Sequence, residues 1–505
     1  MLFNSPEFIF LFVPAAVALH FFLARFGVMP AVIGTTVSSL FFYAVWNPPY
    51  VVLPVLSILA NFWIAQCIVQ AEKVWARPFF IGGIAANLAV LSYYKYWDFL
   101  LSIVDGHKAV PPNVPLALSF TTFVQIAFLV YVYQRRELPQ FRFYALFVAF
   151  FPHLIAGPIV RWGSLGSQLL DKSRYRFNWD NAALGLTIFV FGLAKKVLIA
   201  DTLALHAGPV FDAAAHQELI TALAAWLGCF GFALQMYFDF SGYSDMAIGL
   251  GLLFNFKLPI NFAAPLRSTS MIDLWRRWHM TLSRLARDLI YVPLAAGHES
   301  TIRRSASLML TMVVIGVWHG AGWTFVAWGA FHGVAVLINQ AWHWLRGLHK
   351  PTQNARVLGW AVTFTVFASS AVFFRAPDIE SSWYLIKAMS GFGRVATVSD
   401  FPLEWDSWLI RHDYASRDFV LTWLGTTWSV VGTLWLLVAL LVMCCVPDTL
   451  EIVNYREGDA QSRWRRNLGR FAWRPSWPWA LAVIVLFAVV LTRIGQVSEF
   501  LYYQF

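Results

Sequence analysis

The chain has 505 residues, of which 59% are hydrophobic and 13% are charged, and its formal net charge is +10. This composition excludes an ordinary water-soluble protein and predicts an all-α polytopic membrane protein. The excess of Lys and Arg is typical of cytoplasmic loops, and the sequence contains no basic nucleic-acid motif, so we expect a lipid bilayer and no nucleic acid as its partner.

Apolar stretches recur along the whole chain. A helix needs about 20 apolar residues to cross the hydrocarbon core, because each residue adds roughly 1.5 Å and the core is roughly 30 Å thick. The sequence predicts roughly ten to twelve such crossings. They lie near 7–25, 31–46, 50–70, 79–103, 115–133, 182–204, 217–240, 305–320, 322–344, 357–375, 418–447 and 476–495.

The first apolar stretch has no basic region before it and no cleavage site after it, so we expect a retained helix. Short loops rich in Lys and Arg stay in the cytoplasm, and their placement predicts that both termini face the outside. No internal repeat is visible, so we predict one membrane domain over 1–505. Within it, the polar segment 376–417 is expected to form an external cap.

Two segments interrupt the apolar pattern in the middle of the chain. Two prolines and a glycine in Phe151–Pro158 make a regular spanning helix improbable, and we predict a re-entrant segment that lines a cavity. Further on, Asp239 and Asp245 bracket a Ser-Gly-Tyr-Ser sequence, where we expect the helix to break and Asp239 or Ser241 to cap a second segment. The two carboxylates suit a cation or proton pathway, and structural pairing is the alternative.

The region after these carboxylates has helical periodicity. Apolar residues recur at spacings of four and three at Met271, Trp275, Trp278, Leu282, Leu285 and Leu289, with charged residues opposite. This pattern predicts one amphipathic helix along the membrane face or the protein interior. His279 falls at the boundary between the two faces, from which it can face a cavity.

A histidine also lies between two apolar runs, in Trp318-His319-Gly320. Ionisable residues inside a membrane domain are costly unless paired or wetted, so they are candidates for function. A neutral imidazole can take a proton from a hydroxyl at pH 7. On position alone, a satisfied core histidine explains His319 equally well. The spacing of the histidines and the four cysteines suggests no metal site.

These elements, in this order, resemble the membrane-bound O-acyltransferase (MBOAT) family, in particular its bacterial polysaccharide O-acetylation branch. The stretches that carry the resemblance are Leu2–Ser5, Tyr94–Tyr96, Phe151–Pro158, Lys195–Asp201, Tyr237–Gly251, Trp275–His279, Trp318–Gly320, Phe374–Ala376 and Phe500–Phe505. The resemblance implies an MBOAT-like bundle with re-entrant and amphipathic interfacial helices. It also implies catalytic roles for His319 and, at a second polar position, His279.

From this resemblance we expect acetyl transfer from cytoplasmic acetyl-CoA, with no bound cofactor, toward an exported alginate- or cellulose-like exopolysaccharide. His319 would act as general base or transient acetyl carrier, and His279 would position the donor or polarise its carbonyl. A periplasmic acetyltransferase or carrier subunit and a bacterial inner-membrane location are implied as well. The substrate-binding candidates are Arg276, Arg277, Trp278, Asp239, Tyr243 and Trp318.

Three other functions stay open at this point. D-alanyl transfer to teichoic acid uses the same family chemistry with a carrier-protein thioester. A transporter would explain Asp239 and Asp245 inside a helix bundle, although inverted repeats are not visible. A scaffold that only anchors a periplasmic enzyme would make His319 dispensable.

Overall fold

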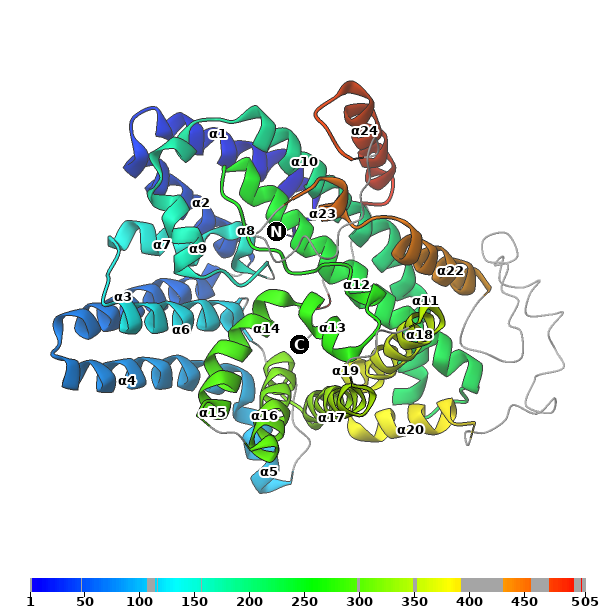
Figure 1. The fold of residues 1–505 in the computed structure, drawn as a ribbon. Helices are drawn as coiled ribbons and strands as arrows, with labels where there is room; N and C mark the ends of the chain where they lie inside the picture. Colours follow the sequence, from blue (N-terminus) through cyan, green and yellow to red (C-terminus); the bar gives the residue numbers. More distant parts are fainter. Residues whose placement is uncertain are drawn as a thin grey trace.

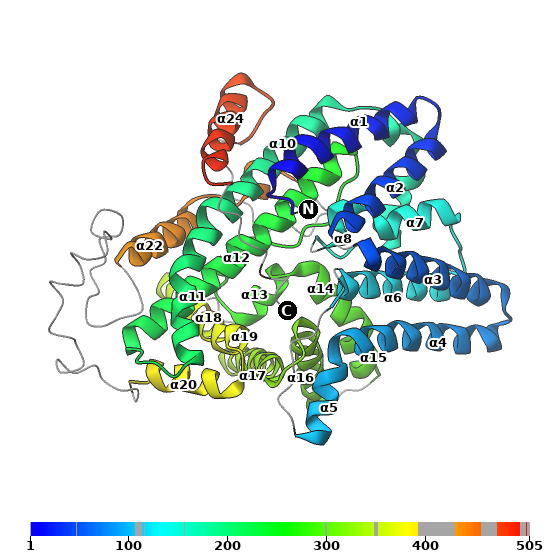
Figure 2. The same ribbon diagram turned by 180° about the vertical axis from the view of Figure 1, so that it is seen from behind.

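The computed structural model describes residues 2–494 and 501, with gaps at 47, 107–113, 116, 156, 298–299, 348–351, 392–429 and 456–471. Every regular element in these ranges is a helix (Figures 1 and 2). The predicted all-α membrane fold is therefore confirmed. Residues 392–417 of the predicted cap lie outside the described residues, and α20 (Ile379–Met389) precedes them.

Seven helical segments in the described ranges are long and apolar enough to cross a membrane. They are Val28–Val45, Pro48–Gln70, Lys73–Asp105, Trp179–Ala215, Ala222–Leu253, Gln353–Arg375 and Val431–Ile452. Two shorter apolar helices cover Phe8–Ala24 and Trp477–Leu491. Three further predicted stretches form helices of similar length that are less apolar: α6 (Leu118–Arg135), α16 (Thr301–His319) and α17 (Trp323–Arg346). The chain is thus a multi-pass membrane protein, with fewer clear spans in these ranges than the sequence predicted.

The N-terminal helices form one side of the molecule. In both views α3, α4 and α6 lie side by side and project away from the body (Figures 1 and 2). The elements of this part are η1 (Phe8–Phe12), α1 (Val13–Ala24), α2 (Val28–Trp46), η2 (Pro48–Val51), α3 (Val52–Gln70), α4 (Lys73–Leu91), η3 (Ser92–Tyr96), α5 (Trp97–Asp105), α6 (Leu118–Arg135), α7 (Phe141–Ala149), α8 (Phe151–Leu154), α9 (Trp162–Leu170) and η4 (Lys172–Tyr175). The four-residue α8 agrees with the prediction that Phe151–Pro158 is no regular span.

The middle of the molecule is built on α12 (Ala222–Leu253), which is continuous and almost entirely buried. The predicted helix break near Ser241 is therefore wrong. Gly242 lies instead where α12 meets α10 (Trp179–Ala194): a Cβ on Gly242 would come within 2.6 Å of the Gly192 carbonyl oxygen. The glycine permits close helix packing, which is a different use of the same residue type. Between these helices lie η5 (Lys195–Ala200) and α11 (Asp201–Ala215).

The remaining helices complete the bundle around α12. The predicted amphipathic helix over 271–289 is two helices, because the chain turns sharply at Trp278 and His279. The elements are η6 (Pro265–Arg267), α13 (Met271–Arg277), α14 (Met280–Ala286), η7 (Arg287–Tyr291), α15 (Val292–Ala295), α16 (Thr301–His319), α17 (Trp323–Arg346), α18 (Gln353–Ser369), α19 (Ala371–Arg375), α20 (Ile379–Met389), α22 (Val430–Cys445), α23 (Thr449–Ile452) and α24 (Trp477–Leu491).

Candidate active site

His319 is the last residue of α16 and is only 4% exposed. Its ring is surrounded by aromatic rings: the centroids of Trp318, Trp328 and Phe374 lie 4.8, 5.1 and 5.2 Å away. Trp328 belongs to α17, which packs closely on α16. Because aromatic rings exclude water from the imidazole, burial favours its neutral form.

The end of α16 is held by two side chains of η3, which leads into α5 (Figures 1 and 2). The Lys95 ammonium donates to the carbonyl oxygens of Trp318 (2.6 Å) and His319 (3.1 Å). The Tyr96 hydroxyl donates to the Val317 carbonyl oxygen at 2.9 Å. The last carbonyls of a helix have no partner within the helix, and a cation there is favourable. These bonds fix three consecutive carbonyl groups, those of Val317, Trp318 and His319.

His279 lies between α13 and α14 in a left-handed backbone conformation (φ 40°, ψ 53°). The side chain of Asn261 holds this turn: its Oδ1 atom lies 3.0 Å from His279 Nδ1 and accepts from the Thr281 hydroxyl at 2.9 Å. The Met280 amide donates to the Asn261 carbonyl oxygen at 2.9 Å. His279 is completely buried, and burial lowers its pKa.

The hydrogen bonds around Asn261 determine the tautomer of His279. The Thr281 backbone N–H can only donate, and it lies 3.3 Å from Asn261 Oδ1, so this atom is the amide oxygen. His279 Nδ1 therefore carries the ring proton, and the lone pair is on Nε2. His279 Nε2 is buried and has no hydrogen-bond partner among the described residues. The site thus presents a fixed acceptor nitrogen.

The Trp318 ring contacts both histidines. Its ring centroid lies 6.0 Å from that of His279 and 4.8 Å from that of His319. Two side chains of α6 flank the Trp318 indole: Phe123 is stacked on it and Phe120 meets it edge-on. The structure therefore brings together His279, His319 and Trp318, which sequence reasoning selected.

A third histidine extends this arrangement. His332 of α17 lies 4.5 Å from Trp328 and 5.3 Å from Trp275, measured between ring centroids. Neither of its ring nitrogens has a hydrogen-bond partner among the described residues. Imidazole and indole rings therefore alternate from His279 to His332. Within the described ranges, no three His, Cys, Asp or Glu side chains gather as a metal site requires.

A family model described as "MBOAT, membrane-bound O-acyltransferase family" matches residues 122–374, half of the chain, and this range contains His279 and His319. The chain belongs to the membrane-bound O-acyltransferase family. It is therefore an O-acyltransferase embedded in a membrane. Membership of this family, which the sequence motifs indicated, is confirmed.

The relatives of this MBOAT chain include three kinds of acyltransferase, named for different acceptors. The peptidoglycan O-acetyltransferase of Helicobacter pylori is 39% identical over 431 residues, 78% of this chain and 81% of the relative. The probable alginate O-acetylase of Pseudomonas aeruginosa is 37% identical over 408 residues, 78% of this chain and 75% of the relative. The teichoic acid D-alanyltransferase of Streptococcus thermophilus is 28% identical and matches 54% of this chain and 72% of the relative.

The other predicted site residues of this MBOAT chain have different surroundings. Trp278 is buried against Phe262 and Phe367. Arg277 forms an ion pair with Asp273 at 2.8 Å, whereas Arg276 is exposed. Arg276 is thus the more accessible cation of the two for an anionic ligand.

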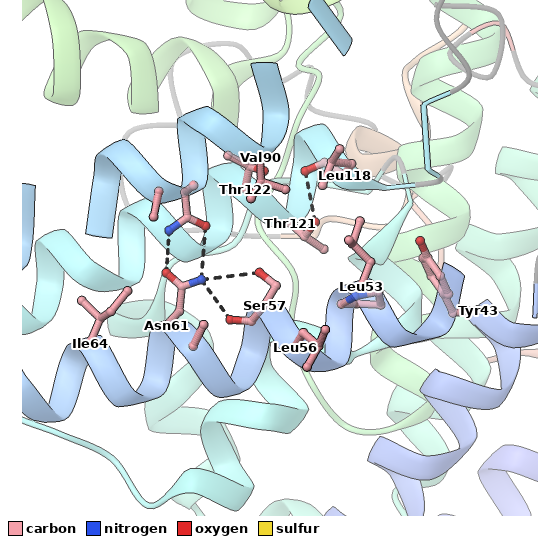
Figure 3. A pocket seen from close by; sticks show the side chains of 14 residues that line it. Tyr43, Leu53, Leu56, Ser57, Asn61, Ile64, Val90, Leu118, Thr121 and Thr122 are labelled. Atoms are coloured by element: carbon pink, nitrogen blue, oxygen red, sulfur yellow. Dashed lines mark hydrogen bonds between the residues drawn. The ribbon is translucent and has the colours of Figure 1, made fainter. Parts of the chain in front are cut away.

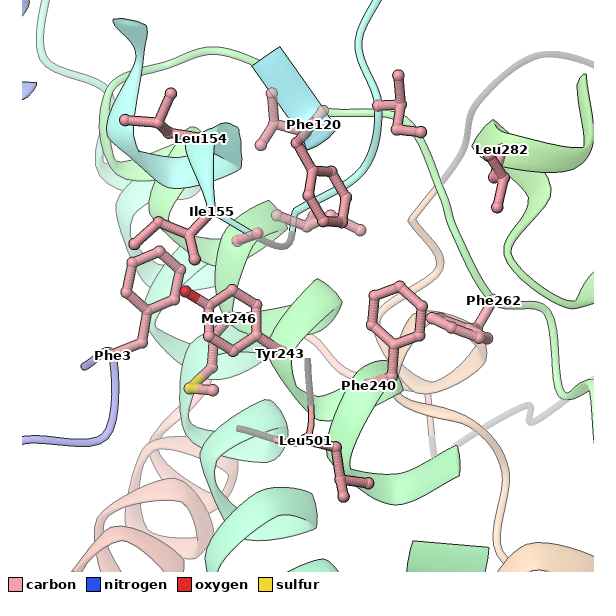
Figure 4. Close-up of a cluster of buried hydrophobic side chains, with 14 of the residues drawn as sticks. Phe3, Phe120, Leu154, Ile155, Phe240, Tyr243, Met246, Phe262, Leu282 and Leu501 are labelled. Carbon is pink, nitrogen blue, oxygen red and sulfur yellow. The ribbon is translucent and has the colours of Figure 1, made fainter. Parts of the chain in front are cut away.

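Asp239 and Tyr243 both lie on α12, where packing and ion pairs surround them. The Tyr243 ring stacks on Phe3, with the centroids 4.6 Å apart, and Figure 4 shows both in a cluster of buried apolar side chains. Asp239 pairs with Lys196 at 2.7 Å and accepts from the Leu501 amide at 3.0 Å. These contacts support the structural pairing that was the alternative to a cation or proton pathway.

Sequence reasoning gave no role to Lys95, Asn261 or His332. Lys95 carries a signal that was available, because a lone lysine in an apolar stretch is costly and invites a search for its partner. Asn261 lies in the loop before α13 and has no distinctive pattern around it. His332 was considered only for metal spacing, and its aromatic neighbours come from three different elements.

Proposed function

We propose that this chain transfers an acetyl group from cytoplasmic acetyl-CoA to a hydroxyl, as a step in the O-acetylation of a polysaccharide of the bacterial envelope. The observation that carries the proposal is the pair of buried histidines whose rings both contact Trp318. Both relatives above 35% identity described here bear O-acetylation names, for peptidoglycan and for alginate. The inner membrane is the bilayer in which such an enzyme reaches cytoplasmic acetyl-CoA.

His319 is assigned the role of general base. As the hydroxyl oxygen bonds to the thioester carbonyl carbon, the hydroxyl proton passes to the imidazole. The carbon–sulfur bond then breaks, and the coenzyme thiolate leaves and takes the proton from His319. A transient acetyl group on His319 is the alternative route, and retention of label on acid-quenched protein distinguishes the two.

His279 is assigned to the acceptor hydroxyl rather than to the donor carbonyl. Its Nε2 atom carries the lone pair, and a lone pair accepts a hydrogen bond from a hydroxyl but cannot polarise a carbonyl oxygen. The expectation that His279 polarises the thioester is thereby disfavoured. Arg276, which is exposed, suits the phosphates of the coenzyme.

The test compares membranes that contain the unchanged protein, His319→Ala and His343→Ala at equal protein levels. His343 is an exposed histidine on α17 and serves as the matched control. Removal of a general base costs about 10²- to 10⁴-fold in rate. We expect loss of acetyl-CoA turnover and of polysaccharide O-acetyl groups only in His319→Ala. Unchanged acetylation in that variant would contradict the proposal.

D-alanyl transfer is the second candidate, because a teichoic acid D-alanyltransferase is among the relatives. Its lower identity and narrower match favour acetyl transfer. The same membranes, supplied with a D-alanyl carrier-protein thioester, distinguish the two functions. Transfer from that donor but not from acetyl-CoA would favour D-alanyl transfer. A periplasmic partner that passes the acetyl group onward is part of the proposal, and isolated membranes without it test whether it is needed.

A further inference from the structure

A cavity of about 270 Å³ lies between α3, α4 and α6, with Tyr43 of α2 at one end (Figure 3). Four residues that line it are exposed at its mouth: Leu56 and Ala60 from α3, and Ala86 and Val90 from α4. Asn61 and Asn87, at its floor, are buried. Its lining includes neither His319 nor the aromatic side chains around His319.

The mouth opens on the surface that faces the bilayer. Leu56 is 57% exposed and Val90 is 43% exposed. Both lie in segments that are long and apolar enough to span a membrane, Pro48–Gln70 and Lys73–Asp105, and only 28% and 22% of the apolar 18-residue stretch within each is buried. In a membrane-spanning helix, such exposed apolar side chains contact lipid. Whatever enters the cavity by this mouth therefore comes from the bilayer.

The polar groups at the floor already satisfy one another. Asn87 Nδ2 donates to Asn61 Oδ1 at 2.6 Å, and Asn61 Nδ2 donates to Asn87 Oδ1 at 3.2 Å (Figure 3). The Ser57 hydroxyl accepts from Gln125, which does not line the cavity, at 3.1 Å, and the Thr121 hydroxyl donates to the Ala117 carbonyl oxygen at 2.9 Å. A sugar or coenzyme would find few free donors or acceptors here, whereas a hydrocarbon chain needs none.

We propose that this cavity binds one acyl chain of a bilayer phospholipid, with the chain entering between Leu56 and Val90 and ending near Asn61. The inference goes beyond the proposed acetyl transfer and does not depend on it. A void of this size whose lining surface is mainly apolar loses dispersion contacts when empty, and a flexible chain restores them.

The bound chain would support the wall of the active site. One face of α6 lines the cavity with Leu118, Thr121 and Thr122. From the same helix, Phe120 and Phe123 flank the indole of Trp318. A chain in the cavity therefore packs against the element that carries two aromatic neighbours of the active site.

The test uses the full-length protein in nanodiscs of phosphatidylethanolamine that carries a diazirine on one acyl chain. After photolysis, mass spectrometry maps the labelled residues in the unchanged protein, in Ala86→Phe and in Ala85→Phe. Ala86 lines the cavity, whereas Ala85 is exposed on the same helix and is not among the lining residues. We expect labelling of the cavity lining to be lost in Ala86→Phe and retained in Ala85→Phe.

A second measurement covers the case in which Ala86→Phe folds poorly. Phospholipid added to delipidated protein should raise the Tm of Ala85→Phe more than that of Ala86→Phe, because a ligand that binds only the folded state stabilises it. Labelling spread evenly over the exposed faces of α3 and α4, with no preference for the cavity, would overturn the proposal. Purification of the protein with an isoprenoid lipid in the cavity would overturn it as well.

Discussion

The Nζ atom of Lys95 lies 2.6 Å from the carbonyl oxygen of Trp318, although 223 residues separate the two in sequence. Among the described residues Lys95 forms no ion pair with a carboxylate, and its side chain is buried. Its charge is compensated by the C-terminal carbonyls of α16. The position of His319 therefore depends on η3, an element of the N-terminal part of the chain.

Lys95→Met should lower acetyl transfer while the protein still reaches the membrane. Loss of a buried hydrogen bond to a charged group costs roughly 1.5–3 kcal/mol, which corresponds to about 10- to 100-fold in rate if it is felt in the transition state. Turnover of acetyl-CoA by membranes measures the effect. Lys73→Met, on the exposed start of α4, is the control. Equal turnover in both variants would show that Lys95 does not position His319.

His332→Phe should retain activity, whereas His319→Phe should abolish it. Both imidazoles pack against Trp328, but His332 is enclosed by Trp275 and Trp328 and has no polar partner among the described residues. A phenyl ring can replace a space-filling imidazole but cannot take a proton. Acetyl transfer by the two variants at matched protein levels is the measurement. Inactive His332→Phe with a normal Tm would give His332 a chemical role.

Gly242→Leu should reduce the amount of folded protein. Its Cβ would come within 2.6 Å of the Gly192 carbonyl oxygen, and backbone atoms cannot move aside as a flexible side chain can. Overpacking of this kind costs about 1–3 kcal/mol or more. Membrane level and Tm in detergent are compared with those of Gly208→Leu on α11, where a Cβ meets no atom within 4 Å. A Tm equal to that of the control would contradict close packing of α10 on α12.

Lys195→Met should destabilise the protein strongly. The Lys195 ammonium lies 2.8 Å from Asp245 and 2.6 Å from Asp448, and all three side chains are largely buried. Removing one partner leaves buried carboxylates uncompensated, which costs about 3–5 kcal/mol. The Tm in detergent should fall well below that of Lys172→Met, an exposed control. Similar Tm values for the two variants would indicate that water reaches the carboxylates.

The sequence was sufficient to predict the helical membrane fold and to select His279 and His319. His319 stands out because an ionisable residue between apolar runs is costly, whereas His279 was selected by its place at the boundary of the amphipathic pattern and by the family resemblance. The sequence was insufficient where one spacing of apolar residues is compatible with two different structures. The 4-3-4 spacing over Met271–Leu289 is compatible with a continuous helix, but the left-handed turn at His279 depends on Asn261, which lies outside that pattern.

The second wrong prediction, the helix break in α12, concerned Gly242. In Ser241-Gly242 a glycine beside polar residues was interpreted as a helix break, because it was considered alone. Its partner is Gly192, fifty residues earlier on another helix. Contacts of this kind, like that between Lys95 and Trp318, join distant segments, and no local pattern reveals them.

The buried lysines of η5 also set an order for assembly. Each ammonium pairs first with a carboxylate made soon after it, Lys196 with Asp201 and Lys195 with Asp245. The second partner comes later: Asp239 for Lys196, and for Lys195 Asp448, 253 residues further on. Before Asp448 is made, Asp245 alone compensates Lys195, and the buried cluster lacks one of its two carboxylates. A chain whose translation stops before Asp448 therefore leaves the Lys195 ammonium with half of its carboxylate neighbours.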